Sequence, residues 1–175
     1  MQGLTLSAAT ALALVTPALA QEAAMATFID ADGMEIGSVT LSQSDDGVTV
    51  SGELVGIPPG EHGFHFHETG DCDSAGGFES AGDHFNPTSH QHGHENPEGP
   101  HAGDLPNVTA GEDGTVAVDL TTAGVSLSEG DPVYVFDDDG TALVLHAQAD
   151  DYVTDPSGNS GDRIACAVIE ANTAP

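Results

Sequence analysis

The segment from Gly63 to Asp104 reads GFHFHETGDCDSAGGFESAGDHFNPTSHQHGHENPEGPHAGD and carries seven of the nine histidines. It begins with His65 and His67 in an alternating run with two phenylalanines, and side chains two apart on a β-strand point to the same face. The rest is rich in Gly, Pro, Asn and Ser without helical or strand periodicity, which is typical of a loop. We therefore expect two imidazoles to converge at the start of a long loop.

Four residues in that loop offer further metal-ligand atoms: His84, His92, His101 and Asp104. Three imidazoles and one carboxylate make a tetrahedral zinc set, whereas an H-x-H pair with further imidazoles suits copper. Histidine-rich segments also occur as solvated stretches that bind metal loosely. The residue types alone leave both interpretations open.

The composition is strongly acidic. The 175 residues, a length typical of one domain, contain 29 Asp and Glu but one Lys or Arg, which gives a formal net charge of −28. Nucleic acid and anionic membrane surfaces are poor partners for such a field. Disorder is the alternative for so acidic a chain, but 38% hydrophobic residues in an alternating pattern favour a folded domain. The charge then indicates a solvated surface, and it would suit a salty habitat.

The first twenty residues contain no charged side chain and have a largely apolar run from Leu4 to Val15. Ala18 and Ala20 form a small-residue cleavage site, so we predict a signal peptide over 1–20 and a mature domain over 21–175. A positively charged residue before the apolar run, usual in such signals, is missing. A membrane anchor is the alternative, but the run is too short to span a bilayer. We expect a periplasmic or secreted protein whose mature form lies outside the membrane.

Short alternating runs separated by turn residues predict about eight strands, at the spacing of an antiparallel sandwich or barrel. Two long segments without strand pattern, Glu68 to Pro106 and Ala147 to Asp162, are expected to be functional loops. Besides the run at His65, the predicted strands are Ala26–Ile29, Ile36–Leu41, Val48–Val55, Val116–Leu120, Val133–Phe136, Ala142–His146 and Ile164–Ile169.

A set of motifs between Ala26 and Glu170 resembles the copper,zinc superoxide dismutases, most closely the exported bacterial members. The motifs are HGFHFH, GDC, SAGDHFNP, HGH, GPHAGDLPN, LVLHAQADD and GNSGDRIACAVI. The resemblance implies an all-β fold, an eight-stranded antiparallel Greek-key β-barrel or sandwich with two long functional loops.

The resemblance also implies a role for each site residue. The copper ligands would be His65, His67, His84 and His146, and the zinc ligands His84, His92, His101 and Asp104. His84 would be shared as a bridging imidazolate, and Asp150 would link His65 to His92 through their second nitrogens. Arg163, the only Lys or Arg in the chain, would stand over copper and hold the anionic substrate. His62 is expected to be structural, while His90 and His94 match no ligand position.

The two cysteines, Cys72 and Cys166, are expected to form a disulfide, because export permits oxidation. The alternative is a pair of free thiols that bind metal, although the spacing lacks any C-x-x-C pair.

The activity implied is disproportionation of superoxide to oxygen and hydrogen peroxide, with redox-active copper and a structural zinc that orders the loop. His84 would leave copper on reduction and take up a proton. One alternative is a copper-binding or copper-delivery domain without turnover, and another is a disulfide-stapled structural β-domain with incidental metal. The resemblance implies either a homodimer or a monomer, because relatives pair through different faces of the barrel and some exported members are monomeric.

Overall fold

The computed structural model describes residues 23–172, so the predicted signal peptide lies outside the described residues. The strands are β1 (Ala23–Asp30), β2 (Glu35–Ser44), β3 (Gly47–Leu54), β4 (Gly60–His62), β5 (Phe64–His67), β6 (Val108–Ala110), β7 (Val116–Thr122), β8 (Ala142–His146) and β9 (Arg163–Ala171). Two short 3-10 turns, η1 (Ser74–Gly76) and η2 (Glu79–Ala81), lie in the loop after β5. Within 23–172 no helix is long and apolar enough to cross a membrane.

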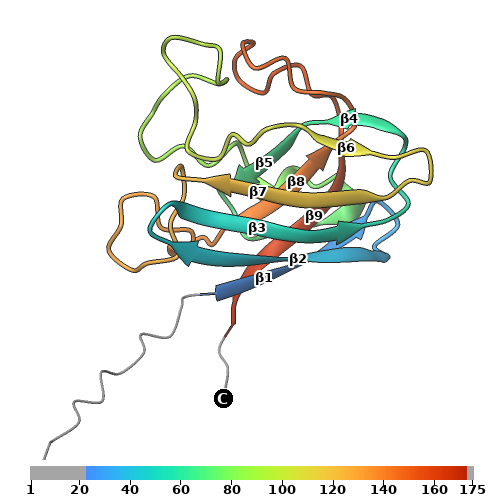
Figure 1. The fold of residues 1–175 in the computed structure, drawn as a ribbon, viewed down its shortest axis with the longest axis horizontal. Helices are drawn as coiled ribbons and strands as arrows, with labels where there is room; N and C mark the ends of the chain where they lie inside the picture. Colours follow the sequence, from blue (N-terminus) through green and yellow to red (C-terminus); the bar gives the residue numbers. More distant parts are fainter. Residues whose placement is uncertain (1–22, 173–175) are drawn as a thin grey trace, which may run out of the picture.

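The nine strands form one antiparallel sheet in the order β4-β6-β7-β3-β2-β1-β9-β8-β5. The two edge strands, β4 and β5, are consecutive in the chain and separated by Gly63 alone. The sheet therefore curls until its edges meet, and Figure 1 shows β5, β8 and β9 running behind β7, β3 and β2. This confirms the predicted all-β antiparallel architecture.

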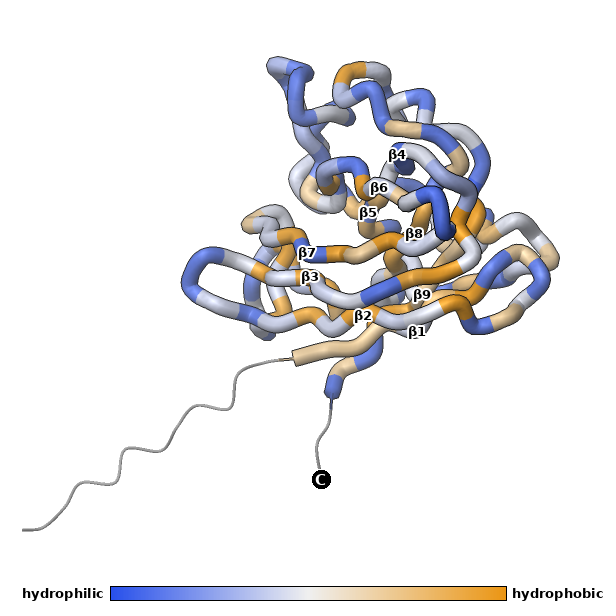
Figure 2. The backbone as a smooth tube through the Cα atoms, turned by 45° about the vertical axis from the view of Figure 1, so that its right-hand side comes forward, coloured by the Kyte–Doolittle hydropathy of each residue, from blue (hydrophilic) through white to orange (hydrophobic). Residues whose placement is uncertain are grey.

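Alternating burial along the strands builds the core inside this curled sheet. In β2 the buried residues are Ile36, Val39 and Leu41, and exposed residues occupy several of the positions between them. The largest fully buried side chains include Phe28, Phe64 and Phe66. Figure 2 shows the same division, with hydrophobic segments concentrated in the strands and mainly hydrophilic loops above them.

The strand count differs from the prediction in two places. The three-residue strands β4 and β6 were not predicted, because segments this short carry no readable alternation. Val133–Phe136 was predicted as a strand and is not one: it makes only an isolated bridge, between Ser126 and Tyr134. Its apolar side chains pack on the core, with Val135 buried. The apolar residues of this segment thus indicate that it is buried, although it does not pair as a strand.

Both predicted long loops are present, and they lie beside each other at the top of Figure 1. One connects β5 to β6, and the other occupies 147–162 between β8 and β9. They are joined by hydrogen bonds: the His92 backbone N–H donates to Asp155 Oδ1 at 2.8 Å, and the Asn107 side chain bonds the backbone of Asp150 through both its amide atoms. These contacts bring the histidine-rich loop over the end of the barrel.

Candidate metal centre

Strands β5 and β8 carry three of the candidate ligands. They pair antiparallel, with His65 opposite Val144. The alternation of β5 turns Phe64 and Phe66 into the core and sends His65 and His67 to the other face. His146 ends β8, so its ring joins them. All three histidines are buried.

Four buried imidazole nitrogens converge without any hydrogen-bond partner in 23–172: His65 Nδ1, His67 Nε2, His84 Nε2 and His146 Nε2. Ligand atoms of these four residues lie within 4.8 Å of one another. In three of the rings the opposite nitrogen contacts an oxygen that only accepts: Asp150 Oδ2 at 2.7 Å from His65, Gly82 O at 3.0 Å from His67, and Gly161 O at 3.2 Å from His146. That nitrogen therefore carries the hydrogen, and the unpartnered one carries a lone pair. This first set is a cluster of lone pairs suited to a metal ion.

A second set surrounds one carboxylate oxygen. Asp104 Oδ1 lies 2.9 Å from His84 Nδ1, 3.0 Å from His92 Nδ1 and 3.4 Å from His101 Nδ1. The other oxygen of Asp104 accepts from the backbone N–H groups of Gly93 and His101, at 2.9 and 3.0 Å. The carboxylate is thus fixed by the backbone, and three Nδ1 atoms face it. Three imidazoles and one carboxylate are a donor set that fits tetrahedral zinc.

His84 belongs to both sets. Its Nδ1 faces Asp104 while its Nε2 is among the four unpartnered nitrogens. The structure therefore brings all seven predicted ligand residues together, with His84 at the junction.

Asp150 links the two sets from the side away from the unpartnered nitrogens. Its Oδ2 lies 2.7 Å from His65 Nε2, and its Oδ1 lies 3.0 Å from His92 Nε2. Gly158, with φ of +63°, packs directly against this carboxylate, and a Cβ there would collide with Asp150 Oδ1. Asn107 and Gly158 were not singled out in the sequence, although both fall in motifs quoted above.

Burial sets the protonation of the first set. It lowers the pKa of His65 to about 4, against the opposing effect of Asp150, and that of His146 to about 3. It also lowers the pKa values of His67 and His84. In the metal-free protein these rings are neutral near pH 7, as metal binding requires.

The second set behaves differently. Burial alone would lower the pKa of His92, but its hydrogen bonds to Asp104 and Asp150 outweigh burial and raise it to about 9. Burial likewise opposes ionisation of Asp104 and Asp150, yet hydrogen bonds from the histidines hold both carboxyl pKa values well below their usual range. A metal ion entering this set would displace a proton from His92.

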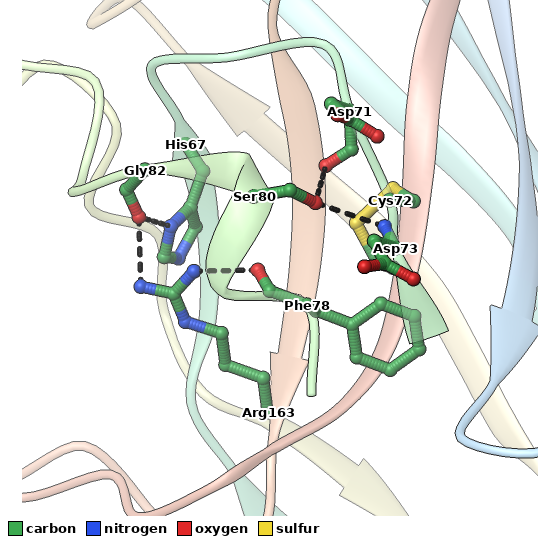
Figure 3. Close-up of a disulfide and its surroundings, with 9 residues drawn as sticks. His67, Asp71, Cys72, Asp73, Phe78, Ser80, Gly82 and Arg163 are labelled. Carbon is green, nitrogen blue, oxygen red and sulfur yellow. Dashed lines mark hydrogen bonds between the residues drawn. A yellow bond between two sulfur atoms is a disulfide. The ribbon is translucent and has the colours of Figure 1, made fainter. Parts of the chain in front are cut away.

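Arg163 is half-buried at the start of β9. It donates from its two terminal nitrogens to Phe78 O and Gly82 O, both at 2.7 Å, and Gly82 O also accepts from His67 Nδ1 (Figure 3). The disulfide between Cys72 and Cys166, shown in the same view, ties this loop segment to β9 a second time. The predicted disulfide is confirmed.

A cavity of about 560 Å³ opens above the first set. His67, His84, His146 and Arg163 line it together with residues of both long loops. His90 lines it too, whereas His94 is exposed and lies near the ring of Tyr152. His62 is buried outside both sets, with its ring nitrogens 2.8 Å from Pro58 O and His146 O, which agrees with a structural role.

Comparison with known proteins identifies relatives of this arrangement. The family model described as "Copper/zinc superoxide dismutase (SODC)" matches residues 35–169. "Superoxide dismutase [Cu-Zn] 2" of Aquifex aeolicus is 43% identical over 160 residues, covering 90% of this chain and 93% of the relative. "Superoxide dismutase [Cu-Zn]" of Caulobacter vibrioides is 41% identical over 141 residues, covering 79% and 80%.

Solved structures agree with the sequence relatives. The crystal structure of a double mutant of a SOD-like protein from Bacillus subtilis superposes with a TM-score of 0.80 at 44% identity, covering 82% of this chain and 95% of that one. The chain therefore belongs to the copper/zinc superoxide dismutase family.

Proposed function

We propose that the protein disproportionates superoxide, with copper held by the first set and zinc held by the second. The observation that carries the assignment is the cluster of four unpartnered imidazole nitrogens that shares His84 with the carboxylate set. Two superoxide ions and two protons would yield one oxygen and one hydrogen peroxide. Copper bound there would supply the one-electron chemistry, alternating between two oxidation states, whereas zinc has no second oxidation state to offer.

The residues of the chain support this reaction in distinct ways. Arg163 presents a positive charge to the cavity, and its two carbonyl contacts fix the guanidinium where an anion would reach the first set. His84 Nε2 is the atom at which a proton would be held and passed on, because Nδ1 stays engaged by the second set. Asp150 holds His65 and His92 in one tautomer each, which orients both sets.

The test is metal quantification of the purified protein alongside a superoxide-consumption assay. We expect one copper and one zinc per chain, with dismutation that persists after free copper has been removed. In the His146→Gln variant copper should fall while zinc stays, and in His84→Gln both should fall. An equal loss of zinc in the two variants would contradict the assignment. Stoichiometric copper without turnover would support the alternative of a copper-binding or copper-delivery domain, and variable, weakly held metal would support a structural β-domain.

We also propose that the chain is exported through residues 1–20 and matures at Gln21, into the periplasm or the medium. The disulfide and the bacterial relatives support export. N-terminal sequencing of the protein recovered outside the cytoplasm tests this.

For assembly we propose a homodimer, supported by the exposed apolar side chain of Met25 on β1 and a shallow groove beside it that includes Ile29 and Val168. Sedimentation of the purified protein decides it.

A further inference from the structure

The mouth of the cavity is lined by exposed carboxylates: Glu68, Glu79, Asp83, Asp155 and Asp162. The carboxylates of Glu79, Asp83 and Asp162 make no hydrogen bond or ion pair with any residue in 23–172. Against these five carboxylates the cavity lining has one cationic side chain, Arg163. An approaching anion therefore meets repulsion at this mouth, whereas a cation is attracted.

The imidazole nitrogens at the floor of the same cavity also favour a cation. His67, His84 and His146 line it, each more than nine-tenths buried, and each has an Nε2 without a partner in the described part of the chain. A buried lone pair left unpaired is costly, and only a hydrogen-bond donor or a cation would satisfy it. The cavity thus leads from free carboxylates to three free imidazole nitrogens.

His90 stands at the mouth with a lone pair available. Its Nδ1 lies 3.1 Å from Pro100 O, a carbonyl that only accepts, so Nδ1 carries the hydrogen of the neutral ring and Nε2 the lone pair. No described residue bonds that Nε2. The side chain of Asn86 holds the His90 backbone at both N–H and C=O, at 3.0 and 2.9 Å. His90, which matched no ligand position in the sequence, is therefore held in place as a potential ligand.

We propose that His90 and the carboxylates at the mouth form an outer, low-affinity binding site for copper ions, which captures the cation and passes it inward to the first set. The site rests on the proposed copper assignment of that set. Imidazole with carboxylate oxygens is a donor mixture that copper(II) accepts. Within 23–172, His90 belongs to no group of three or more ligand atoms lying within 4.8 Å of one another. A captured ion is thus loosely held and free to move to the four converging nitrogens.

Copper uptake by the zinc-loaded, copper-free protein tests this site. Copper(II) sulfate is mixed with the protein in a stopped-flow instrument, and the visible absorption of the bound ion is followed. At low ionic strength Glu79→Gln should slow uptake about fourfold, the effect of one unit charge about 10 Å from a divalent ion in water. That difference should vanish at about 1 M salt, where the Debye length is about 3 Å. His90→Gln should slow uptake at both salt concentrations, because it removes a ligand rather than a charge.

Matched controls separate the outer site from general effects of charge and composition. Glu112→Gln makes the same charge change in an exposed turn before β7, and His94→Gln makes the same ring replacement on the same loop; neither residue lines the cavity. Both controls should take up copper at the unmodified rate.

Equal rates for His90→Gln, Glu79→Gln and the unmodified protein would overturn the outer site, as would equal slowing in the controls. The final copper content reports separately on the proposed function. One copper per chain in every variant, reached at equal rates, refutes the outer site alone. Failure of the unmodified zinc-loaded protein to bind one copper refutes the copper assignment, and with it the outer site.

Discussion

His146 should make the stability of the metal-free protein depend on pH. Its ring is 3% exposed, and burial, followed by repulsion from His65, lowers its pKa from 6.5 to about 3. As the pH falls, His146 is protonated near pH 6.5 in the unfolded chain but only near pH 3 in the folded protein. The contribution of His146 to stability is therefore complete above pH 6.5 and is lost as the pH falls toward 3.

The magnitude follows from the difference between those two pKa values. At pH 5, which is about 1.5 units below the unfolded pKa, His146 is protonated in the unfolded chain and neutral in the folded protein. This stabilises the unfolded state by about 2 kcal/mol relative to pH 8. His65, with its pKa near 4, adds a loss in the same direction. His92 acts oppositely: its pKa is raised to about 9, so its contribution is complete below pH 6.5 and is lost as the pH rises through 9. A single pH profile mixes these effects, and a variant is needed to isolate one.

The assay compares the metal-free, disulfide-intact protein with its His146→Gln variant by urea unfolding, followed by circular dichroism because the chain has no tryptophan. Between pH 8 and pH 5 the unmodified protein should lose about 2 kcal/mol more of its free energy of unfolding than the variant. Any cost of the glutamine itself is independent of pH and cancels. His94→Gln, which replaces an exposed ring, should follow the unmodified protein. Parallel profiles for the unmodified protein and His146→Gln would refute the reasoning.

The disulfide, Arg163 and the net charge give three further predictions. Cys72 and Cys166 are 94 residues apart in sequence. Replacing both with Ser should therefore lower the free energy of unfolding, measured in urea, by about 4.7 kcal/mol on the chain-entropy model. Reaction of two thiols in the native protein would contradict the bridge. Arg163→Ala should lower the dismutation rate more than tenfold with metal content intact. The reason is that a unit positive charge about 10 Å from the substrate anion contributes about 1.7 kcal/mol at an effective dielectric of about 20. An unchanged rate would mean that the metal alone captures the substrate. With metal content fixed, the dismutation rate should stay flat or rise between about 0.1 and about 1 M sodium chloride. The added salt shortens the Debye length from about 10 to about 3 Å and so screens the repulsion between the substrate and the −28 charge. A steep monotonic fall would show that local attraction dominates.

The strands were largely predictable because their alternation reflects one buried face. Val48–Val55 was predicted and β3 spans Gly47–Leu54; Ala142–His146 coincides with β8. The failure at Val133–Phe136 has a physical cause. Its apolar residues pack on the core from a loop, where the Ser126 N–H bonds Val133 O and the Val135 N–H bonds Ser126 O. Periodicity reports which side chains are buried, and it does not report whether a neighbouring strand is present to pair with them.

The candidate site was predictable in its residues and not in its supports. The resemblance named the seven candidate ligand residues, Asp150 and Arg163, and the structure brings the candidate ligands and Asp150 together. It could not indicate that Gly82 O holds both His67 and Arg163, or that Gly161 O holds His146. Every residue has a backbone carbonyl, so no side-chain pattern shows which carbonyl lies opposite which ring. That depends on how the loops fold over the barrel.

Which nitrogen of each ring faces a metal is decided by these supports. His65 would present Nδ1 to the first set because Asp150 occupies its Nε2, whereas His146 would present Nε2 because Gly161 O occupies its Nδ1. Among residues 23–172, no carbonyl and no carboxylate outside the two sets bonds His84: its Nδ1 contacts Asp104 of the second set at 2.9 Å, and its Nε2 has no partner. The other rings of the first set are thus each held by a protein oxygen outside both sets, while His84 is held by Asp104, which is itself a member of the second set. Under the proposed function, the Nε2 side of His84 would therefore be the part of the first set that can change partners, because Nδ1 remains in contact with Asp104.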